Sequence, residues 1–306
     1  MVSQAELDRF YENLVSTVQA NGGVCAITSG MACVEYGVAQ STKDCDVLCT
    51  AESIQGLFAV LTTAEFCGVR CVYRGNISPP LDARWLRGGW TSHFVWKRGD
   101  AEAYLDVFCV APRGSTRWEQ ELAGLYVHPH TVAEMKRTDR IKDWPFTTAL
   151  GTKMLEAGDA RGWLHLFDED VLRQTATQRE CPDDIRRRRP ILKLAFDGDR
   201  RLGPALRNEI HFWHELDHAR IRVYEQAVRP YLSAVRKEQL RNETDLTVQH
   251  AIRLKCAEEH LVVNPLAVYG INRLIAEATD GVRQSSGETW LSWLPDVHEN
   301  FEELAQ

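Results

Sequence analysis

The chain has 306 residues, enough for one large domain or two of ordinary size, and two is our expectation. Hydrophobic residues make up 44% and charged residues 26%, as in soluble globular proteins, which excludes a chain unable to bury a core. The formal net charge of -7 does not indicate a nucleic-acid binder, although it is compatible with a local basic surface.

The cysteines and the hydropathy pattern predict the cellular compartment of the protein. Nine cysteines are scattered, mostly within apolar runs, which is typical of small buried side chains in a reducing compartment and not of a disulfide framework. No Cys/His set has structural-zinc spacing. The opening MVSQAELDRFYENL predicts a charged amphipathic helix in place of a signal peptide, and no apolar stretch is long enough to span a bilayer. We expect a cytoplasmic protein without membrane contact.

The first half of the chain alternates helical and strand-like patterns. Helices are expected at 5–20, 31–37 and 54–65, and strands at 24–29, 45–50, 69–75, 93–99 and 103–110. The pair Gly99-Asp100 predicts a hairpin between the last two strands. Periodicity and turn residues together therefore predict an α/β (α+β) domain over residues 1–145.

The pattern changes near Pro129, and from Thr131 onward nearly every segment is predicted to be helical. The clearest helices cover 131–137, 146–158, 211–228 and 246–261. The second expected domain, residues 146–306, is therefore α-helical and would bind an acceptor or a partner.

Three carboxylates are the main candidates for chemistry. Asp44 and Asp46 begin a strand, and because alternate side chains on a strand share a face, both project together while Cys45 and Val47 face the core. Like charges this close repel unless a cation lies between them, and paired carboxylate oxygens suit Mg²⁺ or Mn²⁺. Asp106 lies in the apolar strand AYLDVFCV, where an aspartate is costly to bury unless it is paired or ligates a metal. If the two strands are neighbours, the three acids converge.

A small turn precedes the acids. Ser29-Gly30 links a predicted strand to a short helix, and such a turn presents backbone N–H groups to which phosphate oxygens bind. Gly30 would let the backbone approach a ligand closely, and Ser29 adds a hydroxyl group. A phosphate-binding turn, a metal pair and a third acid are together the parts needed for phosphoryl transfer.

These motifs together resemble the polymerase-β-like nucleotidyltransferase superfamily. The matching stretch is ITSGMACVEYGVAQSTKDCDVLCT, which combines a strand, a Gly/Ser turn, a helix and an Asp-x-Asp strand, with a third Asp on a later strand. STKDCDVL and KRTDRIKD (136–143) most resemble the bacterial abortive-infection and toxin–antitoxin branch. The resemblance covers residues 20–145, less than half of the chain. The family turn is often Gly-Gly or Gly-Ser, so Ser29-Gly30 leaves the order of roles at the turn open.

The resemblance implies a fold, namely a mixed-sheet core followed by a helical domain, and an activity. A nucleoside monophosphate would pass from an NTP such as ATP to an acceptor hydroxyl, with release of pyrophosphate. Asp44 and Asp46 would hold Mg²⁺ ions and the triphosphate, and Asp106 would share a metal and activate the acceptor. Ser29 and Gly30 would contact the phosphates. The residues expected to neutralise charge on the triphosphate or acceptor are Lys43, Lys136, Arg140 and Lys142.

The acceptor stays open among RNA, a protein side chain and a small molecule. An alternative function is a non-catalytic nucleotide- or partner-binding module, with a partner protein of the toxin–antitoxin type. A second alternative is a zinc hydrolase, because His214-Glu215-x-x-His218 matches the helical zinc-peptidase signature. Asp217 places a charge where that signature usually has an uncharged residue, and no third histidine follows closely. This favours histidines on a helix of the second domain, where they would line the acceptor groove.

Two further features have two interpretations each. Arg186 to Arg189 are four consecutive arginines, which indicate either a solvated loop before Pro190 or a phosphate-contact patch for a nucleic acid. Trp290 and Trp293 are spaced as on a helix surface that packs, although they could also stack on a base.

Overall fold

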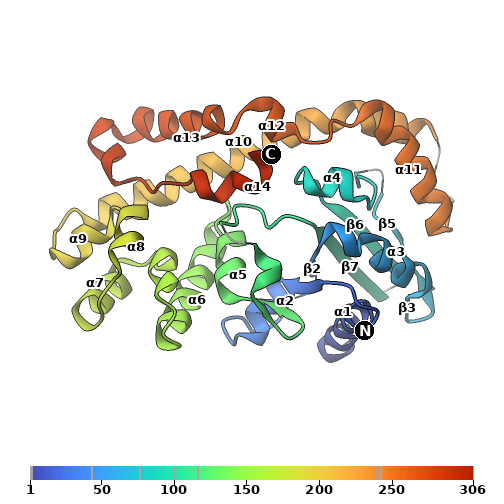
Figure 1. Ribbon diagram of the computed structural model, residues 1–306, viewed down its shortest axis with the longest axis horizontal. Helices are drawn as coiled ribbons and strands as arrows, with labels where there is room; N and C mark the ends of the chain where they lie inside the picture. The colour runs from blue at the N-terminus through green and yellow to red at the C-terminus, as the bar shows by residue number, and fades with distance from the viewer. Residues whose placement is uncertain are drawn as a thin grey trace. The chain divides into compact units, whose positions relative to one another are not determined.

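The computed structural model describes residues 3–42, 44–75, 77–99, 101–115, 117–238, 240 and 243–305. Within these residues the chain combines α-helices with a mixed seven-stranded sheet, and its C-terminal region is mainly helical, which confirms the expected α/β class (Figure 1). The chain divides into two compact units of three segments each. The first contains Met1–Ala111, Arg117–His128 and Val223–Val268, and the second contains Pro112–Thr116, Pro129–Arg222 and Tyr269–Gln306.

The units do not follow the expected division after residue 145. Residues 129–145 group with the helical unit, and residues 223–268 group with the sheet. The helix α10 (Leu202–Lys237) contributes to both units, because the division falls after Arg222.

The first unit contains the sheet, with strand order β5-β6-β7-β2-β1-β9-β8, and a separate pair of strands, β3-β4. Its strands are β1 (Cys25–Thr28), β2 (Asp44–Cys49), β3 (Glu65–Phe66), β4 (Val69–Arg70), β5 (Val72–Tyr73), β6 (Ser92–Arg98), β7 (Ala101–Phe108), β8 (Leu122–Ala123) and β9 (Tyr126–Val127). Its helices are α1 (Gln4–Ala20), α2 (Ser29–Glu35), α3 (Ile54–Thr63), α4 (Ala83–Arg87), α11 (Leu246–His260) and the part of α10 that follows Arg222. Short helical turns cover Ala51–Ser53 and Trp118–Gln120.

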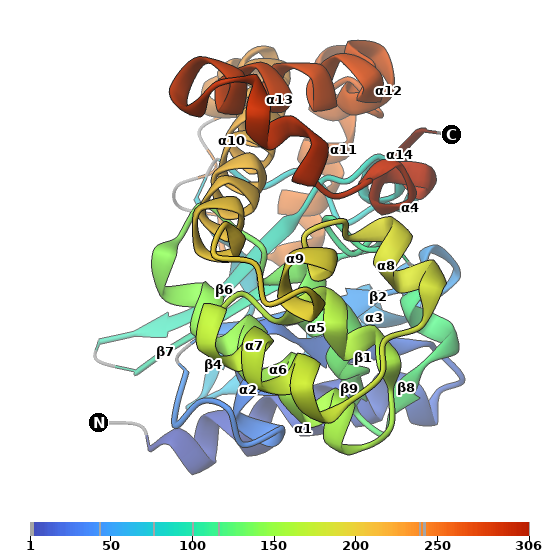
Figure 2. The ribbon, with the colours of Figure 1, turned by 90° about the vertical axis from the view of Figure 1, so that its left-hand side faces the viewer.

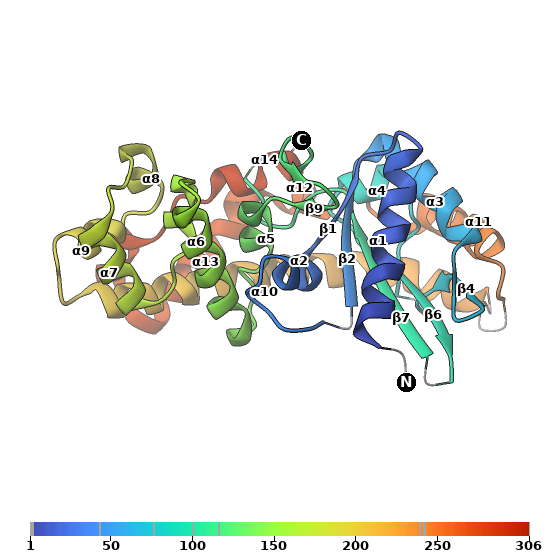
Figure 3. The ribbon, with the colours of Figure 1, turned by 90° about the horizontal axis from the view of Figure 1, so that it is seen from below.

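Helix α1 covers one face of the sheet and lies across β2 and β7 (Figure 3). It begins where the Ser3 N–H donates to the Glu6 carboxylate at 2.8 Å, and its apolar stripe is buried against the sheet. Tyr11 is buried in that stripe, and its hydroxyl group donates to the Tyr104 carbonyl and accepts from the Tyr104 N–H, both at 2.8 Å. Burial raises the pKa of Tyr11, so the hydroxyl stays protonated and joins α1 to β7.

The segment 223–268 belongs to the sheet unit because α11 packs beside β5 (Figure 1). The Tyr73 N–H donates to the Gln249 side chain at 2.9 Å, and this bond satisfies a buried donor of a short strand. The indoles of Trp85 and Trp90 donate to the carbonyls that follow α11, at 3.2 Å and 2.9 Å. Gly88, which ends α4, packs against the same backbone.

The second unit is built from helices, several of which face the viewer in Figure 2. They are α5 (Pro129–Met135), α6 (Trp144–Glu156), α7 (Glu169–Gln178), α8 (Asp183–Arg188), α9 (Leu192–Phe196), the first part of α10, α13 (Ile271–Ser286) and α14 (Glu302–Ala305). Shorter helical turns cover Ile141–Asp143, Ala160–His165, Glu288–Trp293 and His298–Phe301, and α12 (Pro265–Tyr269) lies at the boundary of the two units. Helix α13 lies beside α10, where Glu215 packs closely on Gly281 and Arg222 pairs with Glu277.

The arginine run is not a solvated loop, and that interpretation is wrong. Asp183 and Asp184 stand in the first turn of α8 and the basic residues in its last turn, an arrangement that the helix dipole favours. Arg189 then turns inward, where its side chain is 2% exposed and forms a two-pronged ion pair with Glu209. Arg186 lies over the Phe196 ring at 4.2 Å.

Three further observations concern the cysteines, the hydropathy of the helices and the two C-terminal tryptophans. All nine cysteines are free, and eight of them are buried. Within the described ranges, no helix is both long enough and apolar enough to cross a membrane. Trp290 and Trp293 are half-buried in a short helical turn, with Arg201 over the Trp293 ring at 5.6 Å.

The packing of residues 261–264 against α4 can be tested at Gly88. A Cβ there would lie 1.9 Å from the Val263 carbonyl oxygen, so Gly88→Ala is expected to lower the free energy of unfolding by about 1–3 kcal/mol. Gly56→Ala in α3 is the control, because its Cβ meets nothing within 4 Å and should stabilise the helix by roughly 0.5–1 kcal/mol. Urea unfolding measures both, and equal stability of the two variants would contradict the packing.

Candidate functional site

A row of polar side chains crosses the middle of the sheet. Strand β2 lies between β1, which is antiparallel to it, and β7, which is parallel to it. Thr28 pairs with Asp46 on one side, and Asp106 pairs with Asp46 on the other. His93 on β6 in turn stands opposite Asp106. Since paired residues on neighbouring strands point to the same face, the four side chains share one face of the sheet.

Asp44 extends the row along β2. It precedes Asp46 by two residues and therefore shares its face, while Cys45 and Val47 are buried on the other face with α1. Asp44 is exposed and Asp46 is half-buried, so both carboxylates are accessible from solvent. Because β7 lies directly beside β2, the acids meet the condition for convergence that the sequence left open.

Asp106 is held by two basic side chains. The His93 Nδ1 lies 2.8 Å from Asp106 Oδ1, and an Arg74 nitrogen lies 3.1 Å from the same oxygen. Arg74 follows β5, and its own N–H donates to the His93 carbonyl at 2.9 Å, which places its side chain at the row. Neither residue is among the site residues predicted from the sequence. Arg74 compensates the Asp106 charge, and the two side chains together fix the orientation of its carboxylate.

The turn after β1 has strained backbone. Ser29 has a φ of 53°, in the left-handed region that costs a residue with a side chain roughly 1–2 kcal/mol. Such strain often accompanies functional sites, and this residue directly follows Thr28 of the row. A Cβ on Gly30 would lie 2.5 Å from the Thr42 hydroxyl oxygen. The glycine therefore lets the segment before β2 return against the turn, and the space beside its Cα is occupied by Thr42.

Three of the four predicted basic residues belong to the second unit, whereas the acids belong to the first. Lys43 lies outside the described residues. Lys136 and Arg140 belong to the second unit, where both approach the buried carboxylate of Asp143, at 3.8 Å and 2.6 Å. Lys142, also in the second unit, is exposed. Lys136 and Arg140 thus have an ion-pairing role within the helical unit.

The row's donor set suits a hard divalent cation. In the described part of the chain, no group of three His, Cys, Asp or Glu side chains is already arranged to hold a metal ion. The oxygens on the row nevertheless come from three carboxylates and one hydroxyl, the ligand types that Mg²⁺ and Mn²⁺ prefer. Carboxylates directly opposite each other on neighbouring strands repel, so Asp46 and Asp106 favour a cation between them.

The zinc-peptidase signature lies on α10 and is bound to its surroundings. The Trp144 indole N–H donates to His214 Nε2 at 2.9 Å, and burial lowers the pKa of His214 and favours its neutral form. A neutral imidazole that accepts at Nε2 carries its proton on Nδ1, so neither nitrogen presents a lone pair to a metal. His218 Nε2 lies 2.9 Å from a carboxylate oxygen of Asp139.

Asp217, the atypical residue within this signature, is a buried anchor. Its carboxylate lies 2.5 Å from an Arg113 nitrogen and 2.9 Å from an Arg220 nitrogen. Burial alone would raise the pKa of Asp217, but Arg113 and Arg220 outweigh it and the pKa lies below its usual value. These contacts give the signature a structural role in the second unit.

Comparisons of the chain with protein-family models, with curated proteins and with solved structures found no match. The candidate site therefore depends on the pairing of β1, β2, β6 and β7 and on the side chains that those strands present.

The anchoring role of Asp217 predicts a large effect of a nearly isosteric change. Asp217→Asn leaves Arg113 buried without a counter-charge and should cost about 3–5 kcal/mol at pH 7. Since the folded-state pKa is depressed, the ion-pair contribution is present above the unfolded carboxyl pKa of about 3.9 and is lost as pH falls through the lower folded pKa.

Urea unfolding of both proteins at pH 7 and near pH 3 checks this, and the difference between them should shrink at the lower pH. Glu215→Gln is the matched control on the same helix, because its carboxylate is 37% exposed and should change stability little. Equal losses in the two variants would show that Asp217 is not the anchor.

Proposed function

We propose that the chain is a metal-dependent nucleotidyltransferase that moves a nucleoside monophosphate from an NTP to an acceptor hydroxyl and releases pyrophosphate. The observation that carries the proposal is the in-register pairing of Asp46 with Asp106 on adjacent parallel strands, with Asp44 on the same face. The strained Ser29 turn next to the same row supports it, as does the motif resemblance. No single motif would suffice without this pairing.

The proposed roles follow from the chemistry of each group. Asp44, Asp46 and Asp106 would hold Mg²⁺ or Mn²⁺, which when bound neutralises charge on the triphosphate. Asp106 would also accept the proton of the acceptor hydroxyl while the acceptor oxygen bonds to the α-phosphorus. The bond from the α-phosphorus to the bridging oxygen then breaks, and pyrophosphate leaves with that electron pair. His93 and Arg74 would keep Asp106 oriented for this transfer.

Two rivals make different demands on the chain. A non-catalytic nucleotide- or partner-binding module would use the same sheet but would not need a proton acceptor at Asp106. A zinc hydrolase would need free lone pairs on His214 and His218, whereas His214 accepts from Trp144 and His218 pairs with Asp139. The acceptor remains RNA, a protein side chain or a small molecule, and a toxin–antitoxin partner belongs to the binding-module alternative.

The first prediction from the proposal is transfer of the α-phosphorus only. The protein is incubated with Mg²⁺, total cellular RNA and protein, and each NTP in turn labelled at the α- or the γ-phosphorus. Label on one macromolecule is expected from the α-position, whereas γ-label should leave as pyrophosphate. Asp106→Asn and the double variant Asp44→Asn/Asp46→Asn should each lower the rate by about 100-fold or more.

Glu102→Gln on the same strand is the matched control. Glu102 pairs with Lys97 and lies four residues before Asp106, roughly 13 Å along β7, so its loss should leave transfer unchanged. Pyrophosphate release without a labelled macromolecule would direct the search to small-molecule acceptors. Neither label nor pyrophosphate, with Asp106→Asn retaining biological activity, would favour the binding module.

A second prediction concerns the charge balance at the row. Arg74→Gln removes a cation from Asp106 and should lower the free energy of unfolding in EDTA by roughly 0.5–1 kcal/mol, because the pair is partly exposed. Mg²⁺ should then raise the melting temperature of Arg74→Gln more than that of the unchanged protein. Arg70→Gln, at an exposed pair with Glu65, is the control. An identical Mg²⁺ response in all three proteins would argue against a cation at the row.

A further inference from the structure

The second unit contains a small pocket of about 20 Å³ that is rich in arginine. This volume is far below the roughly 300–1,000 Å³ typical of sites for drug-sized ligands, so the pocket suits only a group of a few atoms. The lining residues that matter here are Arg137, Arg188, Arg189, Glu209, Trp213 and Asp296. Arg188 and Arg189 belong to the arginine run for which the sequence alone offered a phosphate-contact interpretation.

Arg137 is a buried cation that none of the described carboxylates contacts directly. It is 4% exposed, one nitrogen donates to the Leu164 carbonyl and to His165 Nδ1, and its guanidinium lies 4.8 Å from the centre of the Trp213 ring. Among the described residues, no carboxylate oxygen lies within ion-pair distance of Arg137. Buried arginines are otherwise almost always paired, because an uncompensated charge in the interior is costly.

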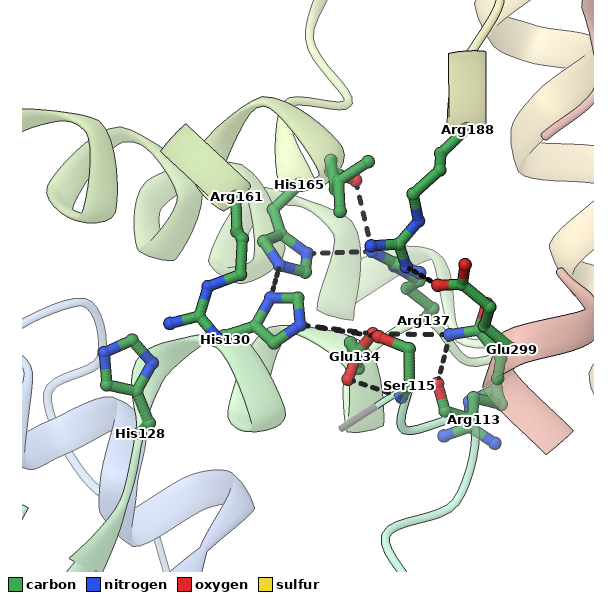
Figure 4. A network of polar contacts seen from close by, with 12 residues as sticks. Arg113, Ser115, His128, His130, Glu134, Arg137, Arg161, His165, Arg188 and Glu299 are labelled. Carbon is green, nitrogen blue, oxygen red and sulfur yellow. Dashed lines mark hydrogen bonds and ion pairs between the residues drawn. The ribbon is translucent and has the colours of Figure 1, made fainter. Parts of the chain in front are cut away.

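The neighbouring histidines, His130 and His165, do not neutralise the charge of Arg137. Figure 4 shows how the three side chains lie. Arg137 donates to His165 Nδ1 at 3.0 Å, so His165 carries its proton on Nε2 and donates to His130 Nδ1 at 2.8 Å. Burial lowers the pKa of both histidines, which favours their neutral forms. At the far end of this series of polar contacts, Glu134 accepts hydrogen bonds from the Ser115 N–H and hydroxyl group, at 3.0 Å and 2.5 Å. The Glu134 carboxylate thus attracts Arg137 from a distance but forms no ion pair with it.

The other charges at the pocket are nearly balanced. The Arg189 charge is balanced by its two-pronged pair with Glu209, and Arg189 also donates to the Trp163 carbonyl. The Asp296 carboxylate accepts from the His298 N–H and ring nitrogen. Arg188 pairs with Glu299, whose side chain is 55% exposed, and such exposed pairs are weak. The pocket therefore keeps an excess of positive charge.

Two buried donors belong to residues that line the pocket and have no acceptor among the residues that the structure describes. They are Arg137 Nε and the Trp213 indole nitrogen, and their residues are only 4% and 2% exposed. Unpaired buried donors are rare and indicate an absent partner. A water molecule would satisfy the donors and leave the Arg137 charge uncompensated, whereas an anion would do both.

We propose that this pocket binds a small oxyanion of the phosphate type. The Arg137 Nε–H and the Trp213 indole N–H supply two buried donors for phosphate oxygens, and Arg188 completes the site from its more exposed side. The phosphate comes either as free phosphate or as the terminal group of a mononucleotide. The inference concerns the second unit alone and does not depend on the proposed transferase activity.

Titration calorimetry with inorganic phosphate on the full chain, at constant ionic strength, tests the proposal. One site is expected in the unchanged protein, and Arg188→Gln should weaken binding by about fivefold or more. Arg187→Gln is the matched control, because Arg187 is exposed on the same helix and does not line the pocket. The double variant Asp44→Asn/Asp46→Asn should bind phosphate normally, which separates this site from the candidate site on the sheet. No binding, equal weakening by Arg187→Gln and Arg188→Gln, or equal binding of acetate would overturn the proposal.

A spectroscopic readout locates the anion independently of affinity. With ¹⁵N-labelled tryptophan, the indole resonance missing in Trp213→Phe is assigned to Trp213, and it should shift on phosphate addition. An unshifted Trp213 resonance at saturating phosphate would exclude this pocket. Adenosine monophosphate and adenosine identify the source, since tighter binding of the monophosphate indicates a nucleotide and weaker binding indicates free phosphate. Binding of adenosine equal to that of its monophosphate would overturn the role of the phosphate group.

Discussion

The parallel pairing of β2 with β7 is the constraint on which the candidate site depends. This register is stabilised from the opposite face, where Cys45, Val47 and Leu105 are buried beneath α1. A slip by one residue would expose that apolar face and bury the carboxylates, so the hydrophobic core determines which residues share the polar face. The packing of the apolar face thus holds Asp46 and Asp106 side by side, where their carboxylates repel each other. Arg74 and His93, which contact Asp106, reduce this repulsion.

The helical unit uses buried arginines in two ways, and the contrast between them gives Arg137 its significance. Arg113 and Arg189 each face a buried carboxylate, so their charges are balanced within the protein. Arg137 is equally inaccessible, yet it contacts a carbonyl, a neutral imidazole and an indole ring. Two of these arginines thus have a carboxylate partner and the third has none in the described part of the chain, which is the contrast that supports the proposed anion site.

Local pattern accounts for part of the candidate site. The spacing of Asp44 and Asp46 and the strand around Asp106 were readable from the sequence, as was the hairpin turn beginning at Gly99. That turn also determines the register of the hairpin. Once Arg98 pairs with Ala101, each earlier residue of β6 pairs with a later residue of β7, and His93 comes to lie opposite Asp106. His93 was therefore predictable in principle, whereas nothing local marked Arg74 or Thr42, which reach the site from a strand end and from an irregular segment. The signature around His214 is the opposite case. Its local pattern predicted a zinc site, but its histidines are bound to residues distant in the sequence.

The sequence by itself determined the element types, the faces of the strands and the change from mixed to helical structure near Pro129. It could do so because these depend on periodicity and turn chemistry within a few residues. Only the tertiary structure decided that β7 pairs with β2, that residues 223–268 complete the sheet unit, and that Arg137 contacts a carbonyl and an imidazole in place of a carboxylate. These outcomes join residues far apart in the chain, such as Tyr73 and Gln249, and depend on which buried donors, charges and apolar faces satisfy one another.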